Sequence, residues 1–284
     1  MKKLILLLCL MLLIGCKESD VKPYNLGDDN LGIKSIIIKK YERQNDDKVM
    51  IGHYLEEYNQ KGLLTTRTEY NLLEDGQIYS KHERFYDEND NILKSLTYTN
   101  GELERETIYT YKRKKIHKVE NYHKDELVYT TAYERKKNYT KTTILDLIND
   151  TEQVNEEVYN NDGSYTLNYE MDGEYTGSVK YNSKNQLLES SRHENDNLME
   201  SSTYEYDAKG NKTNIIQIDS KGEESVALLE YDEYNQLVRY ENSDSDWVME
   251  YIYEYDDKGN YILKIDKTFG EISRYEERTL TYWE

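Results

Sequence analysis

YIYEYDDKGNYI, residues 251–262, is the stretch that decides the predicted fold. Up to Tyr255, Tyr occupies every second position and alternates with Ile and Glu, so one face of an extended segment carries the Tyr side chains. The following residues are typical of a hairpin turn, because Gly259 and Asn260 tolerate positive φ. The stretch therefore predicts a strand, a turn and a second strand that begins at Tyr261.

The same unit recurs along the chain. Four clear copies place Tyr at 181, 206, 231 and 255, at steps of 25, 25 and 24 residues. Looser copies, some with altered loops, begin at five earlier tyrosines: Tyr58, Tyr86, Tyr111, Tyr133 and Tyr159. Second turns such as 219–222 and 267–270 separate the two strands of one unit from the next. Residues 142–157 could be taken for a helix, but the Asn149-Asp150 break fits another hairpin.

Nine repeats of two strands and two turns predict an all-β fold for residues 31–284. We expect a repetitive antiparallel β-meander, an open curved sheet built of hairpin repeats 22 to 28 residues long. The Tyr-x-Tyr-Asp-x-x-Gly-Asn pattern, clearest at 204–211 and 253–260, resembles the YD repeats of Rhs and teneurin shells. In that family many repeats coil into a closed shell around a toxin. We expect nine units to be too few to enclose anything, so the resemblance implies an open meander or short β-spiral, with no catalytic residues to carry over.

The N-terminus has the layout of an export signal. Met1-Lys2-Lys3 precedes an apolar run of eleven residues, Leu4–Ile14, which is shorter than the roughly 20 residues that a membrane-spanning helix needs. Leu13-Ile14-Gly15-Cys16 then resembles the bacterial lipobox. The resemblance implies that residues 1–15 are removed as a lipoprotein signal peptide and that Cys16 carries acyl chains such as palmitate. The alternatives are an ordinary signal peptide with an incidental Cys, or a short buried strand.

In the lipoprotein interpretation, residues 16–30 form a lipidated tether to a membrane. Cys9 is lost with the signal peptide, so the mature chain keeps only the acylated Cys16 and has no disulfide. Lys17 follows the cysteine in place of the Asp that usually retains lipoproteins at the inner membrane. The resemblance therefore implies a lipid-anchored protein of the cell envelope, at the outer membrane, on either its periplasmic or its surface face.

Charge and composition exclude some partners. The chain has 37 Lys and Arg against 56 Asp and Glu, a net charge of −19, and loss of Lys2 and Lys3 makes it −21. A phosphate backbone requires a basic surface, so nucleic acid is not an expected partner. The 30 Tyr against 2 Phe and 2 Trp favour a sheet that is wetted on at least one face, since a buried phenol hydroxyl needs a partner.

No pattern of catalytic or metal-binding residues is present in the sequence. The five histidines are scattered, and the closest pair, His117 and His123, lies roughly 20 Å apart on an extended strand. Acidic residues in turns already bond nearby backbone N–H groups, and they lack the spacing of a calcium loop. We therefore predict no enzyme activity, no metal and no cofactor.

Two basic loops break the acidic pattern. Tyr111 is followed by Lys112, Arg113, Lys114 and Lys115, and one unit later the loop after Tyr133 contains Arg135, Lys136 and Lys137. Equivalent loops of adjacent repeats should lie side by side at one sheet edge. We interpret them as a docking site for an anionic partner, such as an acidic protein or a lipid headgroup phosphate. The alternative is a pair of solvated turns.

These features together favour a membrane-anchored, non-enzymatic protein-interaction module with a protein partner. A more specific hypothesis is an immunity lipoprotein that neutralises an antibacterial toxin, because an acidic inhibitor suits a basic toxin. The alternative is a surface glycan-binding lipoprotein, since exposed aromatic rings stack on sugars.

Overall fold

The computed structural model describes residues 32–44, 47–72, 77–171, 175–244 and 247–283. The predicted signal peptide at 1–15, the lipidation site Cys16 and the tether at 16–30 lie outside the described residues. The described part contains strands joined by turns, as the alternating pattern predicts. Among these residues no helix is both long and apolar enough to cross a membrane.

In the described residues twenty strands follow one another, and each pairs antiparallel with the next. They are β1 (Ile33–Gln44), β2 (Asp47–Tyr58), β3 (Leu64–Tyr70), β4 (Ile78–Tyr86), β5 (Ile92–Thr99), β6 (Glu102–Lys112), β7 (Lys115–His123), β8 (Glu126–Lys136), β9 (Tyr139–Asp146), β10 (Thr151–Tyr159), β11 (Tyr165–Met171), β12 (Tyr175–Tyr181), β13 (Leu187–Glu194), β14 (Asn197–Tyr206), β15 (Lys212–Asp219), β16 (Glu224–Tyr231), β17 (Leu237–Asn242), β18 (Val248–Tyr255), β19 (Tyr261–Thr268) and β20 (Glu271–Tyr282). The all-β antiparallel meander is thus confirmed, and residues 142–157 contain the β9–β10 hairpin.

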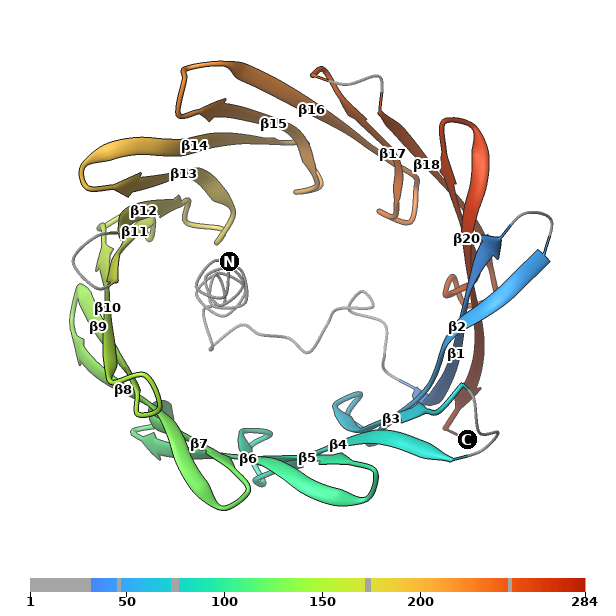
Figure 1. Ribbon diagram of the computed structural model, residues 1–284, viewed down its shortest axis with the longest axis horizontal. Coiled ribbons are helices and arrows are strands. Elements are labelled where there is room, and N and C mark those ends of the chain that lie inside the picture. Colours follow the sequence, from blue (N-terminus) through green and yellow to red (C-terminus); the bar gives the residue numbers. More distant parts are fainter. Residues whose placement is uncertain (1–31, 45–46, 73–76, 172–174, 245–246, 284) are drawn as a thin grey trace.

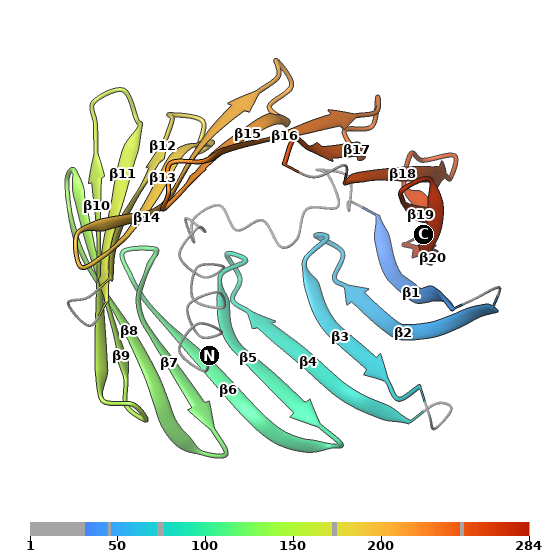
Figure 2. The same cartoon turned by 45° about the horizontal axis from the view of Figure 1, so that its top comes forward.

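The sheet is closed, and the prediction of an open curved sheet is wrong. β1 pairs with β2 on one side and with β20 on the other, with Ile36 opposite Leu280 and Ile38 opposite Arg278. Figures 1 and 2 show the resulting ring of strands. The expectation that nine units could not enclose anything fails for a physical reason. A barrel closes whenever its two edge strands can pair, and closure removes both unpaired edges.

The two ends of the barrel carry different loops. One end, which we call the Asp-turn end, is formed by the loops that follow the repeat tyrosines: 59–63, 87–91, 113–114, 137–138, 160–164, 182–186, 207–211, 232–236 and 256–260. In the loop after Tyr255, Asp256 accepts hydrogen bonds from the backbone N–H groups of Lys258 and Asn260, and Gly259 has φ +80°. β1 begins and β20 ends at this same end.

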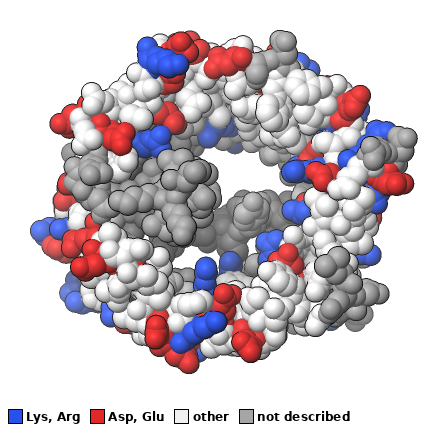
Figure 3. Space-filling view, in the orientation of Figure 1, with Lys and Arg blue, Asp and Glu red and all other residues white. Residues whose placement is uncertain are grey.

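The sheet has one tyrosine-rich face, which we call the tyrosine face and define by Tyr251, Tyr253 and Tyr255 together with the residues in register with them. Most buried side chains lie on it, including Ile36, Leu167 and Ala227. Side chains converge on the inside of a closed sheet and diverge on its outside, so the more buried tyrosine face is the inner wall. Figure 3 shows the barrel hollowed along its axis, with Lys and Arg side chains around the hollow.

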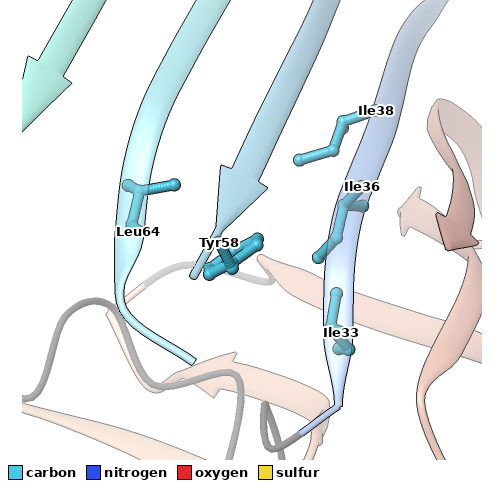
Figure 4. Close-up of a cluster of buried hydrophobic side chains, with 5 residues drawn as sticks. All are labelled: Ile33, Ile36, Ile38, Tyr58 and Leu64. Atoms are coloured by element: carbon cyan, nitrogen blue, oxygen red, sulfur yellow. The ribbon is translucent and has the colours of Figure 1, made fainter. Parts of the chain in front are cut away.

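The main apolar cluster lies where the first strands meet the last. Ile33, Ile36 and Ile38 of β1 pack with Tyr58 of β2 and Leu64 of β3, as Figure 4 shows. Leu280 and Tyr282 of β20 complete the cluster from the other side. Because these contacts join β1, β2 and β3 to β20, this buried cluster stabilises the closure itself.

Candidate functional site

The structure brings the two basic loops to the same end of the barrel. Lys112 and Lys115 are cross-strand partners at the β6–β7 turn, and the β8–β9 turn lies at the same Asp-turn end, two strands away. Arg113 and Lys114 form that first turn with φ of +54° and +64°, so the two-residue hairpin geometry sets the direction of both side chains. The predicted juxtaposition of the loops in adjacent repeats is therefore confirmed.

The basic side chains differ in how they are engaged. Lys112, Arg113, Lys114, Lys115 and Lys137 are exposed, and the described part of the chain places no acidic partner within ion-pair distance of any of them. Lys136 lies 3.3 Å from Glu134, and it also stands over the Tyr139 ring. The Arg135 guanidinium donates to the backbone oxygen of Ile116 and stacks on Tyr133, so Arg135 has a structural role as well.

Arg135 replaces a tyrosine contact that recurs around the barrel. The phenol of Tyr86 donates to the Leu64 oxygen at 2.8 Å, that of Tyr111 to Ile92 at 2.9 Å and that of Tyr206 to Leu187 at 2.8 Å. Each acceptor is the first residue of the preceding repeat's second strand, and Ile116 holds the equivalent place. These contacts give Arg135 a role in positioning its loop, and the predicted docking site keeps the other six basic residues as candidates.

The histidines do not form a site. His82 Nδ1 lies 3.0 Å from Thr97 Oγ1, and burial, with nearby Arg84 and Arg67, holds the pKa of His82 below its ordinary value. The ring of His53 packs on Tyr70. Among the described residues no group of three or more His, Cys, Asp or Glu side chains is arranged to hold a metal ion.

A second feature, which the sequence analysis missed, lies on the inner wall of β14–β17. A cavity of about 290 Å³ is lined by Glu200, Ser202, Tyr204, Lys212, Ile215, Gln217, Ser225, Ala227, Tyr240 and Asn242. These ten residues share the tyrosine face in the register of four neighbouring strands. One sequence signal could have indicated the site. Lys212 occupies the first strand position after a five-residue turn, where the other repeats with such a turn have Leu, Ile or Tyr.

The chain matches no protein-family model and no curated protein. Among solved structures it is similar to a porin-like protein from Bacteroides uniformis. The identity is 14% and the TM-score 0.40, and the match covers 88% of this chain and 98% of that one. A likeness at this level assigns neither family nor function.

Proposed function

We propose that this protein is a lipid-tethered, non-enzymatic binding protein of the cell envelope, with a protein partner as its principal ligand. The observation that carries the proposal is the pair of neighbouring basic loops on a body of net charge −21 after signal-peptide removal. Five of their cations, Lys112, Arg113, Lys114, Lys115 and Lys137, have no acidic partner among the described residues. Like charges repel modestly at a separation of about one Debye length. A partner that supplies acidic groups would remove this repulsion when it binds.

Both faces of the barrel support a protein that stands in water beside the membrane. On the outer face, Lys81 pairs with Glu83 at 2.6 Å and Lys118 with Glu120 at 2.6 Å, within strands β4 and β7. On the inner face, Arg278 pairs with Glu276 at 2.7 Å. A lipid-facing barrel needs an apolar band about 25 Å tall, and each Lys or Arg at its centre costs about 2–4 kcal/mol. We therefore assign attachment to the lipid on Cys16, with the Lys17 position favouring the outer membrane.

Replacement of the lipidated residue tests the attachment. Cys16→Ala should release processed protein from membranes into the soluble fraction, whereas Ser19→Ala, which keeps the lipobox, should leave it membrane-bound. Fractionation followed by immunoblotting measures both. Processed C16A protein that stayed in the membrane would point to a lipid-embedded barrel and contradict the proposal.

The more specific proposal within this class is an immunity protein against an antibacterial toxin. The acidic body would complement a basic toxin, and the basic loops would contact an acidic part of the same partner. The partner should be captured by the soluble fragment that begins at Lys17 and identified by mass spectrometry.

Matched charge reversals test the basic loops. Lys112→Glu with Lys115→Glu changes the net charge by −4, and so does the control pair Lys184→Glu with Lys209→Glu in two other Asp-turn-end loops. The first pair should weaken capture of the partner at low salt, by an amount that shrinks as salt rises, and the control should not. Equal capture by both variants would assign the loops to solvated turns. Binding of the loops to anionic vesicles, without capture of a protein, would identify a lipid headgroup as the ligand in place of a protein partner.

A glycan-binding protein is the second candidate, and a different observation favours it. The inner wall presents Tyr rings beside hydroxyl and amide side chains, in a cavity at β14–β17. Aromatic faces with a few convergent polar groups are the usual lining of small-ligand sites. Binding of oligosaccharides by the purified protein tests this candidate independently of the loops.

A further inference from the structure

Lys212 is a charged residue at a position of the repeat that is otherwise uncharged. In most repeats of the described structure, the residue at or next to the start of the strand after an Asp-turn-end loop faces the repeat tyrosine across a bulge. This position holds Leu64, Ile92, Ile116, Leu187 and Leu237 opposite Tyr58, Tyr86, Tyr111, Tyr181 and Tyr231, and it holds Tyr261 opposite Tyr255. Lys212 takes the same position opposite Tyr206. A place that holds an aliphatic or tyrosine side chain in the other repeats with this bulge therefore holds an ammonium group here.

Among the described residues no Asp or Glu lies within ion-pair distance of the Lys212 ammonium. This ammonium lies 4.3 Å from the centroid of the Tyr204 ring, which attracts a cation without neutralising it. Burial lowers the pKa of Lys212 from its ordinary value, because the ammonium has lost much of its water. A partly desolvated cation without an ion pair is costly to keep, and an anionic ligand would offset that cost.

The acidic group of the cavity is already engaged. Glu200 lies 3.9 Å from Arg192 and accepts a hydrogen bond from the Gln217 amide at 3.0 Å. The Glu200 carboxylate therefore already has partners on both neighbouring strands, Arg192 of β13 and Gln217 of β15. Among the described residues the cavity is left with the positive charge of Lys212, which suits a sugar unit that carries one carboxylate.

The shape of the cavity favours a sugar. Ser202 and Ala227 are buried, and with Ser225 they leave a hollow of small side chains beside Tyr204 and Tyr240. The walls add hydroxyl and amide groups of Ser, Gln and Asn, which can donate to and accept from ring hydroxyls. A volume of about 290 Å³ fits a small ligand.

We propose that this cavity binds an acidic saccharide, a hexuronate unit whose carboxylate pairs with Lys212. The C–H face of the sugar ring lies against Tyr204 or Tyr240, and the polar side chains bind its hydroxyl groups. The inference rests on the glycan-binding candidate and names its ligand class. It does not depend on the basic loops, which lie on β6–β9.

Titration of the full-length protein in detergent with disaccharides tests the proposal by calorimetry. The probes are digalacturonate and diglucuronate, each compared with its neutral counterpart, galactobiose or cellobiose. The acidic disaccharides should bind more tightly than the neutral ones, and the difference should narrow as salt rises. Lys212→Leu places here the residue that Leu64, Leu187 and Leu237 provide in other repeats, and so should fold. It should weaken uronate binding roughly tenfold or more, as expected for loss of a charged hydrogen bond.

Two control variants complete the test. Lys212→Arg keeps the cation and should keep binding, and Lys209→Leu, in the adjacent turn, should leave it unchanged. Equal binding of acidic and neutral sugars, or unaltered uronate binding by K212L, would overturn the acidic assignment while the glycan candidate stands. Binding of none of the four sugars at millimolar concentration would overturn both, and would leave the protein-binding proposal to its own experiment.

Discussion

At the scale of single residues, the repeat tyrosines connect neighbouring repeats. The phenol of Tyr206 on β14 crosses to the backbone oxygen of Leu187 at the start of β13, and Tyr86 and Tyr111 make the same contact in their repeats. The acceptor lies next to a bulge, where the register between the two strands shifts. Phe would preserve the ring packing and remove only the hydrogen bond, so these positions favour Tyr over Phe.

Tyr206→Phe should therefore lower the free energy of unfolding by about 0.5–1.5 kcal/mol, the usual net value of one hydrogen bond. The control is Tyr234→Phe, whose phenol is half exposed and makes no hydrogen bond within the described residues. Its effect should stay within about 0.5 kcal/mol. Urea unfolding measures both, and equal values for the two variants would contradict the cross-repeat role.

Asp256 makes the Asp-turn end sensitive to acid. Burial opposes ionisation of this carboxyl, but hydrogen bonds from the Tyr282 phenol and from the N–H groups of Asn260 and Lys258 outweigh it and hold the pKa of Asp256 below its ordinary value. A depressed pKa means stability that is present at neutral pH and lost as pH falls through the folded-state value. The pKa values of Asp87, Asp207 and Asp219 in other turns are lowered as well.

The melting temperature should therefore fall as pH drops below about 4, the ordinary range for Asp. Asp256→Asn should show a shallower fall, because Asn keeps the turn hydrogen bonds, as Asn182 does in its own turn, but has no proton to gain. Thermal unfolding followed by circular dichroism between pH 3 and 7 measures both slopes. A D256N slope as steep as that of the unaltered protein would remove Asp256 from the acid response.

At the scale of strands, close packing decides the sign of a substitution at Gly177 in β12. Gly in a strand normally costs stability relative to Ala, by about 0.5–1 kcal/mol. Here a Cβ would overlap the Tyr169 ring of β11 and come within 2.6 Å of the Ser191 backbone oxygen of β13. The backbone therefore approaches its neighbours too closely for any side chain.

Gly177→Ala should destabilise the barrel by about 1–3 kcal/mol, the usual range for overpacking. Thr176→Ala, at the adjacent position on the outer face, is the matched control and should have a smaller effect. The midpoints of urea unfolding give the comparison. A G177A protein as stable as the unaltered one would show that Tyr169 moves aside freely.

The strands and turns could be predicted from the sequence because their signals are local. Alternation up to Tyr255 and the residues at Gly259 and Asn260 indicate a hairpin, and the structure has one there. The bulge beside Tyr255 could not be predicted in this way, because a register shift depends on which partner residue is left unpaired. Two-residue turns without Gly, such as Lys124-Asp125, also give weak signals although both residues adopt positive φ.

At the scale of the whole molecule, the closure of the sheet into a barrel could not be predicted from the sequence. It depends on β1 and β20 meeting after eighteen intervening strands, so the twist and tilt of every pair must add up to a full circle. The repeat pattern starts at Tyr58 and does not include β1, whose Ile-rich segment supplies the closing edge. The same limit applies to the Lys212 cavity, which exists only where four curved strands bring small and large side chains together. The basic loops were predictable because they lie in consecutive repeats.

An engineered disulfide tests the closure. Ile37 of β1 and Thr279 of β20 are cross-strand partners, at a distance suited to a disulfide. In the fragment from Lys17, which lacks cysteine, Ile37→Cys with Thr279→Cys should oxidise completely without loss of the β-spectrum. The control pair, Ile37→Cys with Thr281→Cys, places the second cysteine at the next position on the same face of β20, away from Ile37. It should form a disulfide much more slowly. Equal thiol content in both variants after mild oxidation would favour an open sheet.

The pairing of β1 with β20 has a consequence for the order of events during synthesis. Ile38 and Arg278 are cross-strand partners that lie 240 residues apart in the chain. A ribosome adds about 5–20 residues per second, so the isoleucine-rich edge of β1 stays without its partner for roughly 12–48 s, until β20 has been synthesised. During that interval an unpaired apolar edge invites pairing with another chain. A truncated chain that lacks β20 would therefore remain a target for chaperones and proteases, and only a chain that includes β20 can pair the β1 edge and escape them.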